Sequence, residues 1–140
     1  MITTDELLDL SERMGFLHLP AKAAGGIPAL AVQLPSGRCA WAVERKGISS
    51  AQYRQRVCHE LGHCVKGAFY TRLSAPTTKE KCEETARRWS YRKMVPIRDL
   101  IDAIADGDRE PWQIAERLDV PEDMVRSAVT YYTIALSAAM

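Results

Sequence analysis

The sequence lacks any long hydrophobic run and any internal repeat. No segment approaches the ~18 consecutive apolar residues of a membrane-spanning helix. The acidic start, MITTDELLDL, has neither the basic nor the apolar part of a secretion signal. We therefore expect a cytoplasmic protein without membrane association. Hydrophobic residues make up 46% and charged residues 26%, values that exclude a disordered or fibrous chain.

Cysteine pairs at C-x-x-C spacing are also missing. The four cysteines are Cys39, Cys58, Cys64 and Cys82, and no export signal precedes them. We expect four small, mostly buried thiols, which is the usual state of such residues. Three of them lie close in sequence to the candidate site residues described below, which leaves oxidation or metal ligation open.

The whole chain has almost no excess of charge of one sign, but some of its segments do. The net charge is +1. Residues 51–78 sum to +3 (four basic, one acidic) and residues 79–98 to +4 (seven basic, three acidic), whereas residues 99–140 sum to −6 (three basic, nine acidic). The middle of the chain is therefore basic and its C-terminal third acidic.

The pattern of apolar and turn residues predicts a mostly helical α+β protein. Two strand-like runs, Ile27–Leu34 and Arg38–Glu44, flank Pro35-Ser36-Gly37 and predict a β-hairpin. Capping boxes and prolines predict the helices. We expect helices over residues 4–14, 50–69, from Thr77 to just before Pro96, 97–105, 111–118 and 121–136.

The length of 140 residues allows one compact domain and not two. We interpret residues 1–140 as a single domain in three parts. Residues 1–50 form a helix and the hairpin, residues 51–96 form a pair of long helices joined by the loop Thr71–Thr78, and residues 97–140 form a helical tail. In this arrangement the small sheet packs on the helix pair.

The segment His59-Glu60-Leu61-Gly62-His63 contains the pattern His-Glu-x-x-His inside a predicted helix. Residues four apart lie one turn apart on the same face, so His59 and His63 can bind one Zn²⁺. Glu60 is offset by about 100° and lies beside such a metal, where it can accept a proton from an activated water. The alternative is two histidines on a helix surface with a solvated glutamate.

A catalytic zinc normally has three protein ligands and a water. The remaining histidine, His18, lies in an apolar turn and is a weak candidate. Better candidates are Glu80, Glu83 and Glu84 on the next helix, which an antiparallel helix–loop–helix brings back across the first. Spacing alone does not choose between Glu83 and Glu84.

Two motifs, and the number of residues between them, resemble the ImmA/IrrE family of metallopeptidases. They are the H-E-L-G-H segment and Glu83-x-x-Ala86-x-x-Trp89, which leads to Met94-Val95-Pro96. Aligning the family's proline with Pro96 places its ligand glutamate on Glu83. The chain departs from the family at Arg87, Trp89, Ser90 and Lys93, which makes this helix more basic than is usual there.

The resemblance implies a zinc-dependent endopeptidase with His59, His63 and Glu83 as metal ligands and Glu60 as the catalytic residue. Zinc-activated water attacks the peptide carbonyl, with Glu60 as general base and then general acid. Members of the family act on helix-turn-helix repressors of mobile elements such as phages or of stress loci, so the implied partner is such a transcriptional repressor. The alternative is a non-proteolytic regulatory or binding module, of toxin-antitoxin or phage type, with structural or absent zinc.

The sequence offers candidates, but no single choice, for the group that stabilises an oxyanion and for the strand that binds the substrate. The candidates for an oxyanion donor are Tyr53, Tyr70, Arg87 and Tyr91. The run Arg38–Glu44 is our candidate for a sheet edge along which an extended peptide lies.

The tail segment Trp112–Val125 resembles a helix-turn-helix. A DNA-reading helix is basic, but this one begins Pro121-Glu122-Asp123 within a segment of net charge −6, which repels phosphate. We therefore expect no direct nucleic-acid binding. Instead we expect the tail to cover the zinc-binding helices with apolar residues, namely Ile114, Leu118, Val125, Val129 and Tyr132. The basic residues around those helices either form a solvated face or dock an acidic segment of a partner; they are Arg54, Arg56, Arg87, Arg88, Arg92 and Lys93.

Overall fold

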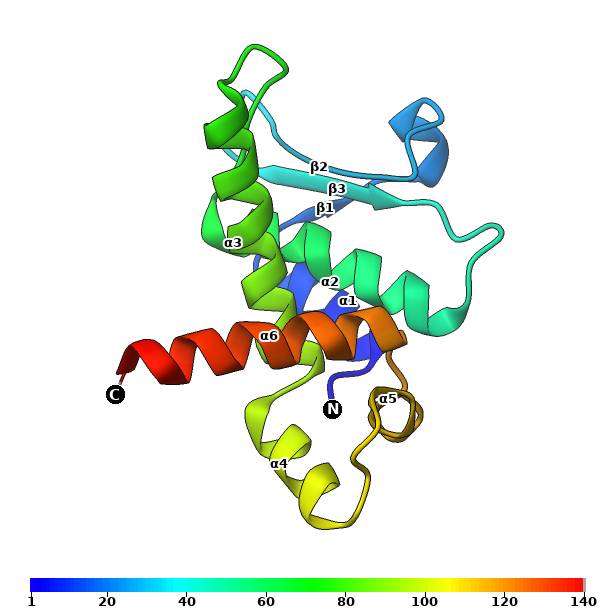
Figure 1. Cartoon of the computed structure of the whole chain (residues 1–140). Coiled ribbons are helices and arrows are strands. Elements are labelled where there is room, and N and C mark those ends of the chain that lie inside the picture. The colour runs from blue at the N-terminus through cyan, green and yellow to red at the C-terminus, as the bar shows by residue number, and fades with distance from the viewer. Residues whose placement is uncertain (140) are drawn as a thin grey trace.

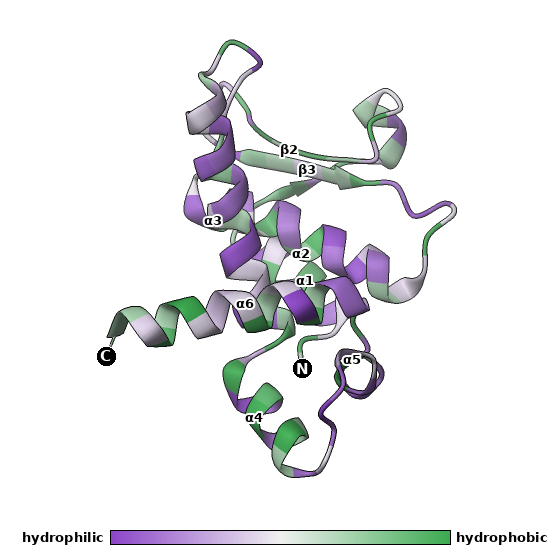
Figure 2. Ribbon diagram, viewed as in Figure 1, coloured by the Kyte–Doolittle hydropathy of each residue, from purple (hydrophilic) through white to green (hydrophobic). Residues whose placement is uncertain are grey.

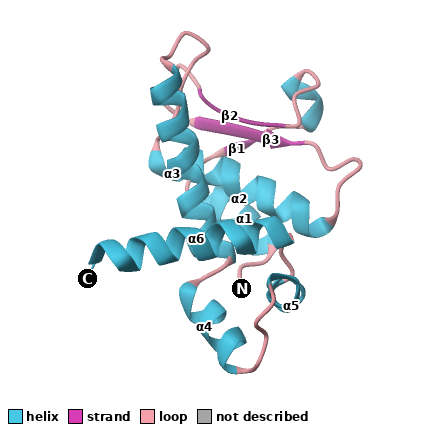
Figure 3. Cartoon of the chain, viewed as in Figure 1, coloured by secondary structure: helices cyan, strands magenta, loops and turns pink. Residues whose placement is uncertain are grey.

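A computed structural model describes residues 1–139 and shows a small sheet packed on the first of two crossing helices, with a helical tail on the other side (Figure 1). This confirms the mostly helical α+β architecture (Figure 3). The elements are α1 (Thr4–Arg13), β1 (Leu17–His18), the 3-10 helix η1 (Ala21–Ala24), β2 (Ala29–Gln33), β3 (Cys39–Val43), α2 (Ser50–Lys66), α3 (Pro76–Met94), α4 (Ile97–Ala105), α5 (Pro111–Leu118) and α6 (Glu122–Ala139).

The sheet has three strands in the order β1-β3-β2. The predicted hairpin is confirmed: β2 and β3 are antiparallel, with Leu30 opposite Ala42. The short strand β1, which the sequence analysis did not predict, pairs parallel to β3. Because β3 lies between two partners, the expectation that Arg38–Glu44 is a sheet edge is wrong; β2 is the edge strand on that side of the sheet.

The main core lies between β3 and α2. All five residues of β3 are buried, and Trp41, Val57 and Leu61 are fully buried together. The Trp41 indole N–H donates a 2.8 Å hydrogen bond to Ser11 Oγ of α1, which satisfies its polar group inside the core. This core fixes α2 against the sheet.

A disulfide joins Cys39 of β3 to Cys64 of α2, with Cα atoms 5.6 Å apart. The expectation of four thiols is therefore wrong for this pair, because the hairpin and the helix bring together two cysteines that are 25 residues apart. Cys58 and Cys82 are free, the former buried and the latter half-buried.

The two long helices begin and end at identifiable signals. Ser49 and Gln52 form a capping box at the start of α2, and Gly67 ends it with φ of 61°. The helix α3 begins at Pro76 rather than with the predicted capping box at Thr77. Proline suits a first helical position because the N–H it lacks has no partner there. As predicted, α3 ends just before Pro96.

The tail packs on the helix pair mainly through apolar side chains. Ile114, Leu118, Val125 and Tyr132 are buried as expected, whereas Val129 is 38% exposed, so its predicted packing role is wrong. In Figure 2 the hydrophobic colour on α4 and on the last turns of α6 lies on helices at the periphery of the molecule. Among residues 1–139, no helix combines the length and apolarity needed to cross a membrane.

Candidate active site

The face of α2 that turns toward α3 carries the His-Glu-x-x-His residues. His63 and Glu60 are buried and His59 is half-buried. One ligand atom from each of the three lies within 4.8 Å of those of the other two. The α-helical spacing thus brings the two imidazoles and the carboxylate together, as the sequence predicts.

A close approach of backbones brings α3 to this face. A Cβ atom on Gly62 would lie 2.9 Å from the backbone oxygen of Ala86 and 3.2 Å from its Cα. The absence of a side chain at Gly62 therefore permits α3 to cross α2 at this point. Glu83, one turn before Ala86, consequently reaches the two histidines.

Glu83 contacts both imidazoles. Its Oε1 lies 3.2 Å from His59 Nε2 and its Oε2 lies 2.8 Å from His63 Nε2. Burial raises the pKa of Glu83, but the neighbouring histidines lower it by more, so the carboxyl titrates below its usual range. Burial lowers the pKa of His59 and thus favours its neutral form, which can ligate a metal.

The hydrogen bond on the far side of His63 tests whether this set of groups fits a metal. His63 Nδ1–H donates to the backbone oxygen of Ala68 at 2.7 Å. In a neutral His63 this bond leaves a lone pair on Nε2, which faces the Glu83 carboxylate. Two lone pairs at that distance require a proton or a cation between them. Two imidazole nitrogens, a carboxylate and a hydrogen bond that orients one ring fit a divalent metal such as zinc.

Glu60 is the buried acid beside this set. It is 8% exposed, and burial, followed by the charge of Glu83, raises its pKa to about 8. It makes no ion pair with any cation among residues 1–139. A carboxyl group with this environment holds or releases a proton near neutral pH, as general acid–base chemistry requires.

The three candidate glutamates of α3 have different partners. Glu84 accepts hydrogen bonds from Arg87 at 2.9 Å and from Arg88 at 3.1 Å. Glu80 also pairs with Arg87. Both therefore belong to an ion-pair network with arginines of α3, and Glu83 alone of the three contacts the histidines.

His18 lies away from this centre, as expected. Its ring stacks on Trp41, with centroids 4.0 Å apart and planes within 5°. Burial lowers its pKa, and its contact with an indole rather than with other donors gives it a packing role.

The four candidates for an oxyanion donor differ in position. Tyr70 lines a hollow together with Glu60, His63 and Glu83, and its hydroxyl lies 3.4 Å from Glu83 Oε2. By contrast, Tyr53 is buried under the Arg45 guanidinium. Arg87 lines a second hollow with His59 and Glu60, but its guanidinium is bound to the carboxylates of Glu80 and Glu84. Tyr91 is buried and lines that second hollow beside Ser127 of α6.

The contribution of β2 is the feature that sequence reasoning missed. Its residues Ala29, Leu30 and Ala31 line the same hollow of about 190 Å³ as Glu60 and His63. One edge of β2 pairs with β3, and the other is without a strand partner in residues 1–139. Only the strand order could reveal this, since both strands of the hairpin are equally apolar in sequence.

Comparison with family models gives the class of the chain. Residues 45–130 match Peptidase M78, the IrrE N-terminal-like domain, over more than half of the chain. The chain therefore belongs to this peptidase family, which confirms the resemblance to the ImmA/IrrE family. The match contains α2 to α5 and part of α6 but not the sheet. Comparisons with curated proteins and with solved structures find no match.

Proposed function

We propose that this chain is a zinc-dependent endopeptidase that cleaves a protein regulator. The observation that carries the proposal is the convergence of His59, His63 and Glu83 beside the buried Glu60. Membership of a peptidase family supports the reaction class.

In this proposal the three converging side chains hold the metal and Glu60 moves protons. When bound, zinc lowers the pKa of a water and polarises the peptide carbonyl. His59 and His63 would hold the metal through Nε2 and Glu83 through its carboxylate. The hydrogen bond from His63 Nδ1 to Ala68 keeps one ring in the correct tautomer. Glu60 accepts a proton from the attacking water and donates it to the departing amine.

Tyr70 is the donor that we propose for the developing oxyanion. Its hydroxyl is already directed to the centre, since it donates to Glu83. Burial and the charge of Glu83 raise its pKa, so the phenol stays protonated and can donate at neutral pH. The ring is 41% exposed, which leaves it room to turn toward a substrate.

We also propose that the substrate lies extended along β2. One edge of this strand pairs with β3, and the other is without a strand partner in residues 1–139. Backbone N–H and C=O groups on such an edge can pair with an added polypeptide of any sequence. A peptide there passes over Glu60 and His63, which share a hollow with β2. As for identity, the family resemblance supports a helix-turn-helix repressor of a mobile element or stress locus.

The proposal is tested by incubating the zinc-loaded protein with a proteome-derived mixture of denatured proteins and identifying new peptide termini by mass spectrometry. We expect cleavage by the wild type, loss of at least about 100-fold in Glu60→Gln, and no change in Glu116→Gln, which removes an exposed carboxylate on α5. Retained cleavage in Glu60→Gln would contradict the assigned role. Bound zinc without any cleavage would favour the non-proteolytic alternative.

A further inference from the structure

A hollow of about 280 Å³ lies at the end of the sheet where β2 begins. Because β2 and β3 are antiparallel, the start of β2 lies beside the end of β3, and Figure 1 shows η1 at the same end of the sheet. The lining includes Lys22 of η1, Ile27 and Pro28 just before β2, Glu44 and Lys46 after β3, and Arg56 of α2. Four separate parts of the chain thus meet at this hollow.

The lining of this hollow has an excess of positive charge. It contains three cations, Lys22, Lys46 and Arg56, and one carboxylate, Glu44. None of the three cations has a carboxylate within 4 Å among residues 1–139. One oxygen of Glu44 accepts the backbone N–H of Lys46 at 2.9 Å. Three positive charges therefore stand against one negative charge, and the hollow, which we call the cationic hollow, attracts an anion.

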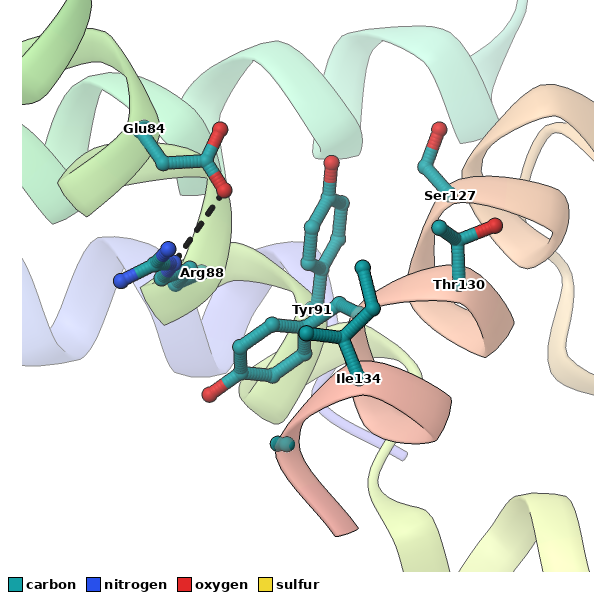
Figure 4. Close-up of a pocket in the computed structure, with 8 residues that line it drawn as sticks. Glu84, Arg88, Tyr91, Ser127, Thr130 and Ile134 are labelled. Atoms are coloured by element: carbon teal, nitrogen blue, oxygen red, sulfur yellow. Dashed lines mark hydrogen bonds and ion pairs between the residues drawn. The ribbon is translucent and has the colours of Figure 1, made fainter. Parts of the chain in front are cut away.

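The hollow between α3 and α6 has a different charge pattern. Its lining includes Arg88 and Glu84, and Arg88 Nε lies 3.1 Å from Glu84 Oε1 (Figure 4). Such a pair leaves little charge to attract a ligand, because each group compensates the other. The cations of the cationic hollow, by contrast, are free to bind an anion that enters it.

The cationic hollow adjoins the candidate active site through the chain itself. Pro28 of its lining is followed directly by Ala29, which lines the hollow that contains Glu60 and His63. Arg56 is half-buried and lies on α2 one turn before Glu60. Two separate elements, β2 and α2, therefore run from the cationic hollow to the candidate catalytic residue.

The backbone of β2 can direct a polypeptide from one hollow to the other. Pro28 accepts a hydrogen bond from the Glu44 N–H at 2.8 Å, and Leu34 donates its N–H across the other end of the hairpin, also at 2.8 Å. Residues that bond to the partner strand alternate in an antiparallel pair, so the even-numbered residues of this run bond to β3. Ala29 and Ala31 consequently direct their N–H and C=O groups to the other edge. A polypeptide paired with them continues past the start of β2 to the cationic hollow, at about 3.3 Å per residue.

We propose that the cationic hollow is a substrate subsite that binds an acidic side chain, Asp or Glu, about two to four residues from the scissile bond of a polypeptide paired with β2. The inference rests on the proposed peptidase function. The substrate carboxylate pairs with the half-buried Arg56, and the exposed Lys22 and Lys46 add attraction at longer range. The hollow thus selects among polypeptides that the backbone of β2 accepts without regard to sequence.

Three peptides with a neutral fluorophore test the proposal. Each has a core in which Val alternates with Thr, flanked at both ends by Glu, by Gln or by Lys, so that either direction of binding places a flanking residue at the hollow. Fluorescence anisotropy follows their binding to the Glu60→Gln protein, which cannot consume them, with and without zinc. We expect the Glu peptide to bind at least about fivefold more tightly than the Gln peptide, and the Lys peptide to bind most weakly. Equal binding of the three, or no binding of any up to ~1 mM, would overturn the proposal.

Charge variants in the same background locate the binding. We expect Arg56→Gln to weaken binding of the Glu peptide about fivefold, and Lys22→Gln and Lys46→Gln about twofold each, because their charges are more exposed. Glu44→Gln acts in the opposite direction. It keeps an oxygen that can accept the Lys46 N–H but removes the negative charge of the lining, so we expect binding about twofold tighter.

The matched controls are Arg98→Gln on α4 and Lys66→Gln at the end of α2, which remove exposed cations outside the lining. We expect neither to change binding of the Glu peptide, and we expect the Gln peptide to bind every variant equally. Glu-peptide binding that Arg56→Gln leaves unchanged, or that it weakens only as much as Gln-peptide binding, would place the acidic side chain elsewhere and overturn the proposal.

Zinc content and cleavage, measured on the wild type alongside, separate the two proposals. Zinc-dependent cleavage with peptide binding that ignores the charge variants leaves the peptidase proposal intact and removes the subsite. Binding that follows the charge variants without zinc or cleavage removes the peptidase proposal, and with it the assignment of the cationic hollow to a substrate.

Discussion

The α2–α3 pair and the α5–α6 pair each consist of two consecutive helices joined by a short connection. They differ in the kind of side chain that they bury between them. Between α2 and α3, Glu60 and His63 are buried and face Glu83. Between α5 and α6, the buried residues are apolar, for example Ile114 and Val125. The α2–α3 pair thus buries the polar groups that we propose for catalysis, whereas the α5–α6 pair buries apolar side chains.

On our proposal, the difference teaches that the outline of two helices and a turn does not by itself indicate function in this chain. The α5–α6 pair has the outline of a helix-turn-helix, and Asp119 even adopts the left-handed conformation, with φ of 53°, in its turn. Yet hydrogen bonds fix this turn to α2, because the buried Arg54 donates to the backbone oxygens of Leu118 and Asp119. By contrast, burial of the Glu60 carboxyl group beside two imidazoles costs folding stability. Such a cost is typical of residues that take part in catalysis.

The largest expected effect concerns the stability that the fold loses when the buried Glu60 ionises. Because the pKa of Glu60 is raised to about 8 in the folded chain, the metal-free fold retains a proton that the unfolded chain releases near pH 4.5. Stability from this group is therefore complete below about pH 4.5 and is lost as pH rises through 8. Glu60→Gln mimics the protonated form. In EDTA we expect it to equal the wild type at pH 4 and to exceed it by a few kcal/mol at pH 8.5.

Thermal unfolding of both proteins across this pH range checks the prediction, with the exposed Glu116→Gln as control. A difference between Glu60→Gln and wild type that does not change with pH would contradict the raised pKa. It would also remove the distinction between the α2–α3 pair and the tail.

The second prediction concerns the helix crossing. Gly62→Ala gains about 1 kcal/mol of helix propensity, but its Cβ meets the backbone of Ala86. Since backbone cannot yield as a flexible side chain does, we expect a net loss of about 1–2 kcal/mol in the free energy of unfolding. We also expect zinc affinity to fall at least about tenfold, because Glu83 shifts with α3. A stabilised variant with wild-type zinc affinity would show that the close approach is unimportant.

The third prediction concerns the tail. The Tyr132 hydroxyl of α6 donates at 2.8 Å to the backbone oxygen of Val95, just after α3. Tyr132→Phe leaves that buried oxygen without this donor, so we expect a loss of about 1 kcal/mol in urea unfolding. Zinc affinity stays unchanged, because the residue belongs to the packing region. A variant that loses zinc would couple the tail to the site more tightly than the structure indicates.

The smallest expected effect is a null one. The first turn of α6 carries Glu122 and Asp123, and Arg126 is paired with Glu122 at 2.7 Å. We therefore expect no salt-sensitive binding of the protein to random duplex DNA in a gel-shift assay. Binding that weakens steeply with salt would mean that the tail reads nucleic acid and that its outline does indicate function.

Sequence reasoning reached the local features and missed the spatial ones. The His-Glu-x-x-His face, the hairpin and the proline-limited helices all follow from residues close together in the chain. Spacing could not separate Glu83 from Glu84, because that choice depends on the rotation of α3 about its axis, which the contact at Gly62 and Ala86 sets. The choice of Glu83 came from the family resemblance instead.

The position of β2 at the edge and the pairing of Cys39 with Cys64 needed the strand order. A two-residue strand such as β1 leaves almost no pattern in sequence. Yet β1 is what places β3 in the middle of the sheet, and it leaves β2 with an unpaired edge on the opposite side among residues 1–139. Long-range pairings of this kind carry no local signal.

The most direct test of the central claim is the zinc content per chain of protein purified without added metal, measured by atomic emission for the wild type and Glu83→Ala, with Glu84→Ala as the matched control. We predict about one zinc per chain in the wild type and in Glu84→Ala, and a loss of at least about 100-fold in affinity in Glu83→Ala. A wild type that binds no zinc even after reloading, or a Glu83→Ala variant that binds it as tightly as the wild type, would contradict the account.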